Sequence, residues 1–394
     1  MKNTLRVPNI WRAALVLLCL ALMSYLLYFH RLGTLLPGYS APELQTYTDA
    51  SNWHRVISSP INLPYTVAVW LFATVLHHGI LMTRVVAAAC GVLAGLLFFA
   101  VARLRYNFYV ALLGTILFTT SAGFLHAARF GDGQVLQMGI LALIAGVLAY
   151  RRQPSRHTLT EYALVALLAL LWYVPGLVWF EALTVIVLWR GVQSRLRNTA
   201  TKQLLGLAAT ALVIAAPLII ASVRQPRILL TVLGLPTQFS GLSHVGSNLL
   251  HALLGIAVRS DGNPLVWVGH APLLSITECA LGLLGAYVYL WRKRSRSSIL
   301  LAGNVVISLI LISLGGSVGY ASLVPLLYLF VVAGIGYLLN RWLRVFPRNP
   351  IARGAGVAVV CVMLAFSVLY QVRSYFVAWP HHQATRQAFR LPQP

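Results

Sequence analysis

Residues 83–104 read TRVVAAACGVLAGLLFFAVARL, a long apolar run with an arginine near each end. A helix of about twenty residues is long enough to cross the hydrocarbon core of a bilayer. Runs of similar length recur along the 394 residues, of which 59% are hydrophobic, and the mean hydropathy is +0.79. Water-soluble domains are less apolar than this. The sequence therefore predicts an all-α, polytopic transmembrane helical bundle, because helices satisfy their own backbone hydrogen bonds in lipid.

The apolar runs predict about eleven spans within a single membrane domain over residues 1–394. The first run is too long for a cleaved signal peptide, so we interpret it as a retained span. Residues 63–80 are apolar but interrupted, which favours an interfacial helix, and the Pro175-Gly176 break in 160–190 indicates a hairpin of two short spans. In chain order the predicted parts are the first span (11–29), an outer loop with interfacial helices (30–80), core spans (82–222), a second outer loop (223–272), C-terminal spans (273–372) and a tail (373–394).

The charge balance is strongly basic, with 30 Lys and Arg against 7 Asp and Glu and a formal net charge of +23. The basic residues gather in short clusters between apolar runs, at 151–156, 190–202, 291–296 and 340–353. Such a distribution follows the positive-inside rule and predicts a cytoplasmic N-terminus. It also favours contacts with anionic membrane lipids. Nucleic acid is not a predicted partner, because the chain has no soluble part to carry it.

The seven acidic side chains are scarce enough to be candidates for chemistry. Four of them, Glu43, Asp49, Asp132 and Asp261, are predicted on the outer side of the membrane. Carboxylates gathered there suit a reaction at the membrane–water boundary on a lipid-borne substrate. The four cysteines match no metal motif, and the sequence has no Walker loop, dinucleotide fingerprint or HExxH zinc motif. The sequence therefore predicts no metal site, and it argues against an ATP-driven pump and a metalloprotease.

Several short segments together carry a resemblance to a known family. An apolar span is followed by an outer loop with PG-x-S-x-x-E, then by a Pro-initiated apolar helix and an Arg that leads the next span. This order resembles the GT-C glycosyltransferases, in the branch of the protein mannosyltransferases and the aminoarabinose transferases. The segments are PGYSAPELQTYTDA (37–50), SPINLPYTVAVWLF (59–72), the run 83–104 quoted above and HAARFGDGQ (126–134), with a weaker match in YASLVPLLYLFVVAGI (320–335).

The resemblance implies an enzyme of the plasma (inner) membrane with its active site on the outer, periplasmic side. Such enzymes transfer a sugar from a polyprenyl-phosphate carrier to an envelope acceptor, which is a lipid, a glycan or a protein. The family usually has Asp-Glu in its first loop, whereas this chain has Pro42-Glu43. Either Glu43 takes the role of the main acid, or Asp49 does, or the chemistry of this member is altered.

The proposed reaction needs a base for the acceptor and cations for the leaving phosphate. We expect Glu43 to be the base, with Asp132 orienting the acceptor or supporting Glu43. Arginines suit the phosphate because they bind it with paired, charged hydrogen bonds. The candidates are Arg84, Arg129 and Arg259, followed by Arg55, Arg224 and His244. No cofactor is required by this chemistry, and a role for a divalent cation stays open.

Structural explanations compete with each of these roles. Glu43 completes a helix-capping box with Ser40, Asp132 is placed to cap the next span, and Arg84 and Arg129 are placed to extend to outer headgroups. Two other functions also fit the sequence. One is a transporter or flippase for a lipid-linked saccharide, and the other is a catalytically degenerate GT-C-like partner subunit.

Overall fold

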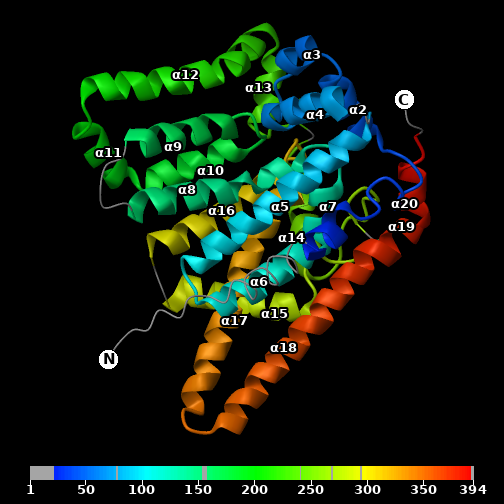
Figure 1. The fold of residues 1–394 in the computed structure, drawn as a ribbon, viewed down its shortest axis with the longest axis vertical. Helices are drawn as coiled ribbons and strands as arrows, with labels where there is room; N and C mark the ends of the chain where they lie inside the picture. Colours follow the sequence, from blue (N-terminus) through cyan, green and yellow to red (C-terminus); the bar gives the residue numbers. More distant parts are fainter. Residues whose placement is uncertain are drawn as a thin grey trace.

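The computed structural model describes residues 22–76, 79–152, 158–239, 241–267, 269–292 and 295–391, which fold into a bundle of helices (Figure 1). In these ranges no β-strand forms, and one isolated β-bridge joins Tyr39 to Leu391. The all-helical, polytopic fold predicted from the sequence is therefore confirmed. Most of the predicted first span, 11–29, lies outside the described residues.

The helices follow one another with short connections. In chain order they are η1 (Tyr25–Phe29), α2 (Ala41–Ala50), α3 (Trp53–Ser58), α4 (Leu63–Leu76), α5 (Leu81–Arg103), α6 (Phe108–Thr120), α7 (Ala122–Arg129), η2 (Gln134–Gly139), α8 (Ile140–Arg152), α9 (Thr158–Leu171), α10 (Leu177–Val187), α11 (Trp189–Arg197), α12 (Thr201–Arg224), α13 (Pro226–Val232), α14 (Leu242–Ala257), α15 (Ile276–Tyr287), η3 (Val288–Arg292), α16 (Arg296–Ser313), η4 (Tyr320–Ser322), α17 (Val324–Val345), α18 (Pro350–Arg373), η5 (Ser374–Ala378), α19 (Trp379–His381) and α20 (Gln383–Ala388).

The number of full-length spans differs from the predicted count. Within the described residues, six helices are long and apolar enough to cross a membrane, or up to eight if each of two bent pairs is one span. Each predicted span after the first has a helix at its position, but several of these helices are short or broken. At 1.5 Å per residue the 14-residue α4 is about 21 Å long, and its interfacial position stays a prediction.

Two breaks in the chain shape the bundle around the site. The pair α6 and α7 bends by 62° at Ser121, whose hydroxyl accepts a hydrogen bond from the Phe124 amide and so caps α7. The predicted Pro175-Gly176 break lies between α9 and α10, where Gly176 has a φ of +80° that suits glycine. The first break leads through α7 into the loop that carries Asp132.

The last helices return to the first loop. Gly38 lies so close to the backbone of Phe389 and Leu391 that an added Cβ would overlap it. Trp379 and Phe389 are buried in the same region. The sequence predicted only a free outer tail after residue 372, yet residues 374–391 pack against residues 30–40 and close one side of the candidate site.

Candidate functional site

Glu43 lies in the first turn of α2, where the capping box predicted from the sequence is formed. The Ser40 amide donates to Glu43 Oε2 at 2.9 Å, and the Ser40 hydroxyl donates to the same oxygen at 3.1 Å. Pro42 fits beside it because the first turn of a helix needs no amide donor. Both Ser40 and Glu43 have no solvent exposure. Local sequence therefore orients this carboxylate, but it does not explain why a charge is buried there.

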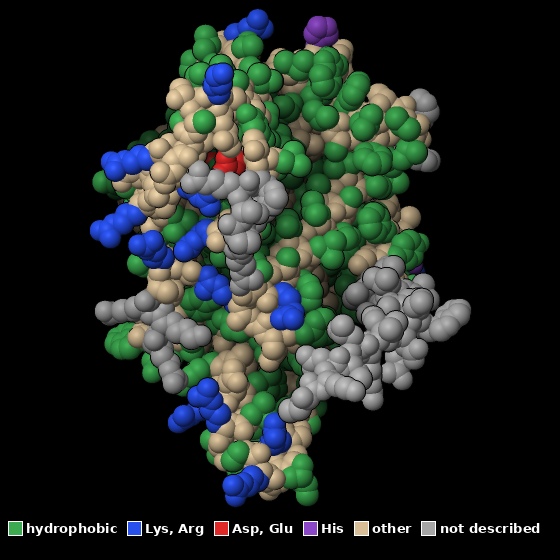
Figure 2. Space-filling model, turned by 60° about the vertical axis from the view of Figure 1, so that its left-hand side comes forward, with side chains coloured by type: hydrophobic (Ala, Val, Ile, Leu, Met, Phe, Trp, Pro, Cys, Tyr) green, Lys and Arg blue, Asp and Glu red, His purple; other side chains and the backbone are tan. Residues whose placement is uncertain are grey.

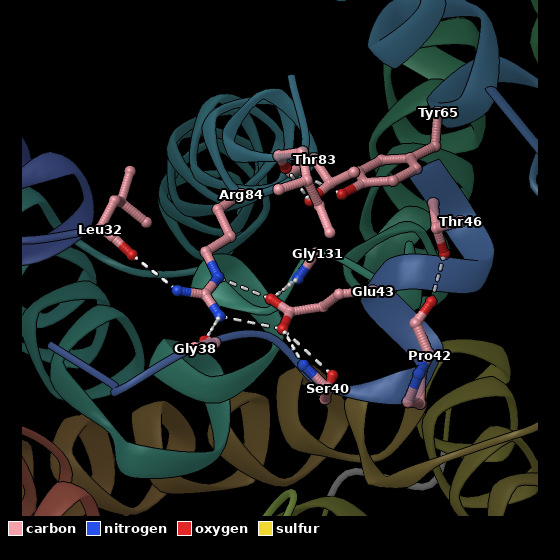
Figure 3. A network of polar contacts seen from close by, with 11 residues as sticks. Leu32, Gly38, Ser40, Pro42, Glu43, Thr46, Tyr65, Thr83, Arg84 and Gly131 are labelled. Carbon is pink, nitrogen blue, oxygen red and sulfur yellow. Dashed lines mark hydrogen bonds and ion pairs between the residues drawn. The ribbon is translucent and has the colours of Figure 1, made fainter. Parts of the chain in front are cut away.

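Arg84, in the first turn of α5, neutralises that charge. Its Nε donates to Glu43 Oε1 at 2.6 Å, and its Nη2 donates to Glu43 Oε2 at 2.9 Å (Figure 3). Its remaining donors reach the backbone carbonyls of Leu32 at 3.0 Å and Gly38 at 2.9 Å. A paired, fork-like contact of this kind is the strong form of an arginine–carboxylate interaction. One guanidinium thus fixes α2, the preceding loop and α5 together.

The carboxylate of Glu43 is fully occupied by donors. Besides Ser40 and Arg84, the Gly131 amide donates to Oε1 at 3.3 Å (Figure 3). The two oxygens therefore accept five hydrogen bonds, about as many as a carboxylate can take. The adjoining cavity has a volume of about 10 Å³, which is room for about one water molecule. In this arrangement Glu43 organises the site and has no free oxygen with which to take a proton.

Asp132 follows Gly131 and lies at the rim of the same network. Its Oδ1 accepts a hydrogen bond from the Gln134 amide at 3.0 Å. Burial raises the pKa of Asp132 to about 7, and the nearby negative charge of Glu43 adds to this rise in pKa. A partly exposed carboxylate with a pKa near neutrality is suited to proton transfer.

Arg129, at the end of α7, faces the same small cavity as Glu43 and Arg84. It donates to the carbonyls of Leu27 and His30 at 2.8 Å each, and it stacks near the rings of Tyr375 and Phe376. Its Nε has no hydrogen-bond partner among the described residues. The structure thus brings together Glu43, Asp132, Arg84 and Arg129, four of the residues selected from the sequence.

The other selected residues lie apart from this cluster. Asp49 accepts a hydrogen bond from Gln45 at 3.1 Å, and partial burial raises its pKa. Exposed Arg55 donates to the carbonyl of Thr48 at 3.5 Å near Asp49, so these two residues form a small group of their own. Three further candidates are solvent-exposed on helix ends and loops: Arg224, His244 and Arg259. Their proposed part in phosphate binding stays a prediction.

Some residues of the site had no signal in the sequence. Gly131 was quoted only as part of a motif, yet an added Cβ on it would overlap Thr83 Oγ1. Tyr65 donates to the carbonyl of Thr83, and Tyr375 reaches the site from the far end of the chain. The aromatic residues after α18 could have hinted at the last contact, because a free polar tail rarely carries so many.

Metal-ligating residues do not gather in the part of the chain that the structure describes, where no three His, Cys, Asp or Glu side chains come together. The acceptor positions of Glu43 are taken by protein donors. The role of a divalent cation, which the sequence analysis left open, is not tested by this geometry.

The fold defines a class, that of polytopic, all-helical membrane proteins. Two crystal structures of ArnT from Cupriavidus metallidurans, one bound to undecaprenyl phosphate and one in the apo state, are similar to this chain. Their TM-scores are 0.56 and 0.57 at 16% and 15% sequence identity, and the match covers 95% and 96% of this chain and 77% of each ArnT chain. No protein-family model matches the sequence, and no curated protein does. The GT-C resemblance is thereby confirmed as a likeness of fold.

Proposed function

We propose that this protein is a membrane glycosyltransferase that takes its sugar from a polyprenyl-phosphate carrier. The observation that carries the proposal is the position of four charged side chains, Glu43, Arg84, Arg129 and Asp132, at one site of an ArnT-like fold. ArnT was crystallised with undecaprenyl phosphate, which supports a lipid-linked donor for this chain as well. The acceptor is an envelope lipid, glycan or protein at the outer face of the plasma membrane.

The partial exposure and the raised pKa of Asp132 make it the base in this proposal. Transfer requires removal of a proton from the acceptor, and a base works best when its pKa lies near the working pH. Burial brings the pKa of Asp132 to about 7. Glu43, which the sequence suggested as the base, instead holds the Gly131 amide and so fixes the loop that carries Asp132. Asp49 remains a second acid, on the exposed side of α2.

Binding of the carrier phosphate requires cations with free donors. Four donors of Arg84 are engaged by Glu43, Leu32 and Gly38, so this arginine orders the site. Arg129 keeps its unpartnered Nε at the shared cavity. We assign the phosphate to Arg129 first, with Arg259, Arg55 and His244 as further candidates.

A catalytically degenerate partner subunit is the second candidate function. Two observations favour it: Pro42 stands where the family has its acid, and every acceptor position of Glu43 is filled. Such a protein would keep the fold and the lipid site without the transfer step.

Sugar transfer in membranes distinguishes the two functions. Radiolabelled sugars on a panel of polyprenyl phosphates are offered to the wild type, to Asp132→Asn and to Asp261→Asn. Asp261 is the matched control, because it is an exposed outer acid whose Oδ1 caps a turn at Asn263. We expect Asp132→Asn to lose activity by about 100-fold or more and Asp261→Asn to keep it. Full activity in Asp132→Asn refutes Asp132 as the base, and no product from the folded wild type supports the partner subunit.

A further inference from the structure

A large cavity lies far along the chain from the Glu43 cluster, lined by α8, α9, α10, α11 and α12, with the start of α16 at its edge. Figure 1 shows α8 to α12 on one side of the bundle. The volume of the cavity is about 440 Å³, within the usual range for sites that hold small molecules. Most of its lining is aliphatic and comes from these five helices, including Leu143, Leu164, Val185, Val192 and Leu207. An apolar cavity of this size inside a membrane protein suits the hydrocarbon chain of a lipid.

Three arginines line the cavity, and each comes from a different basic cluster of the sequence. They are Arg151 at the end of α8, Arg195 on α11 and Arg296, the first residue of α16. Arg151 and Arg296 form no ion pair within the described part of the chain, which includes all seven acidic residues. Figure 2 shows Lys and Arg side chains gathered on this side of the molecule. The positive-inside rule predicts that this side is cytoplasmic.

The cavity is also lined by two carboxyl groups, those of Glu161 and Glu181. Glu161 is held by the Tyr150 hydroxyl at 3.0 Å and by Gln203 at 2.5 Å, and Arg195 approaches it only to 3.9 Å. Glu181, which is 8% exposed, accepts a hydrogen bond from Trp172 on Oε2, while its Oε1 has no partner among the described residues. A buried carboxyl oxygen without a donor is costly. This oxygen is therefore open to a donor that enters the cavity.

We propose that this cavity binds an anionic phospholipid of the cytoplasmic leaflet. The lipid phosphate lies among Arg151, Arg195 and Arg296, and one acyl chain fills the aliphatic space toward Glu181. Guanidinium groups bind phosphate with paired, charged hydrogen bonds. Basic pockets between membrane helices on the cytoplasmic side commonly hold anionic headgroups in this way. The inference does not depend on the proposed sugar transfer.

Lipid selection by the full-length protein tests the proposal. The protein is reconstituted in vesicles that contain phosphatidylglycerol and phosphatidylcholine in equal amounts, and native mass spectrometry measures the lipids that it retains. The cavity is blocked with Gly191→Phe. Gly191 lines it, and an added Cβ there meets no atom within 4 Å, so the helix itself is not strained. Gly354→Phe on α18 is the matched control, because its Cβ is equally free and lies away from the cavity.

A second pair of variants separates the cavity from the general charge of this face. The first changes the three lining residues to Gln: Arg151, Arg195 and Arg296. The second removes the same charge from exposed residues of the same region that do not line the cavity: Arg190, Arg197 and Lys202. Inorganic phosphate in excess is added in a separate arm, to distinguish a lipid site from a site for the free anion.

The wild type should retain phosphatidylglycerol over phosphatidylcholine by about tenfold or more, a preference that corresponds to about 1.4 kcal/mol. Gly191→Phe and the lining triple variant should fall to the composition of the vesicle, while both controls keep the preference. An equal loss in the Arg190, Arg197 and Lys202 variant would overturn the proposal, because the face rather than the cavity would then select the lipid. Unchanged retention in Gly191→Phe would overturn it too, as would displacement of the lipid by phosphate alone.

Discussion

Two ion pairs occur in the described part of the chain, and their surroundings are opposite. In the Glu43–Arg84 pair the closest nitrogen and oxygen are 2.6 Å apart, and the side chains are 0% and 3% exposed. In the Glu161–Arg195 pair the distance is 3.9 Å, and the exposures are 9% and 36%. The residues of the first pair are 41 positions apart in sequence and come from different helices, whereas Arg195 of the second pair leans over Tyr150 at the edge of a wide cavity.

The contrast shows that the burial of an ion pair and the distance between its charged groups decide what the pair contributes. Breaking a buried pair leaves a charge without water or a partner, which is strongly destabilising. A pair at a longer distance whose arginine is 36% exposed contributes little, and its arginine is free to meet another anion. We therefore interpret Glu43–Arg84 as the fixed frame of the candidate active site, and Arg195 as a residue available to a ligand. Four predictions test this contrast, from the largest effect to the smallest.

Replacing Arg84 by Met should have the largest effect. It leaves the Glu43 carboxylate buried and uncompensated, which typically costs about 3–5 kcal/mol of stability. The measurement is the free energy of unfolding in detergent, together with the yield of folded protein. The double variant Arg84→Met with Glu43→Gln removes the charge as well and should recover much of that loss. If the single variant is as stable as the wild type, Glu43–Arg84 is not the frame of the site.

Gly131→Ala disturbs the same pair through the backbone amide that donates to Glu43, and it should have the second-largest effect. The new Cβ would overlap Thr83 Oγ1 and push the Gly131 amide away from Glu43. Overpacking of this kind usually costs about 1–3 kcal/mol. Thermal unfolding in detergent measures the loss, with Gly246→Ala as the control, because a Cβ at Gly246 meets no atom within 4 Å. Equal unfolding temperatures for the two variants would contradict the tight fit at Gly131.

Asp132→Asn should change how stability depends on pH, by a smaller amount. The folded protein raises the pKa of Asp132 from 3.8 to about 7, so it binds a proton more tightly than the unfolded chain does. Stability linked to this group is therefore lost as the pH rises from about 4 to about 7. Asn cannot ionise, so the variant does not lose this stability. Its stability relative to the wild type should therefore increase as the pH rises.

Unfolding temperatures at pH 5 and pH 8 measure this effect, and Asp261→Asn again serves as the control. A constant difference between Asp132→Asn and the wild type at the two pH values would mean that Asp132 does not titrate with a raised pKa. The test needs no substrate, and so it stands apart from the transfer assay.

The sequence predicted the helices and their local caps better than the contacts between distant residues. Apolar length alone indicated the membrane helices, since a span is a local property. The capping box of Glu43 was also predictable, because Ser40 and Glu43 lie three residues apart. Arg84 was predicted as a phosphate ligand and is found bound to Glu43, a contact between distant residues that no local pattern reports. The packing of residues 374–391 against Gly38 was not predicted either, because it also joins residues that are distant in the sequence.

Arg195→Gln should have the smallest effect on stability, below about 1 kcal/mol. Glu161 keeps its hydrogen bonds from Tyr150 and Gln203 in this variant, so its carboxylate is not left without donors. Unfolding by denaturant in detergent, beside Arg84→Met, gives the contrast directly. A loss as large as that of Arg84→Met would mean that Arg195 is a structural residue, and the arginine could not then be spared for a lipid phosphate. A residue that binds a ligand should show a small loss of stability together with weaker retention of phosphatidylglycerol. The reason is that its guanidinium contributes little to folding and so remains available to the lipid phosphate.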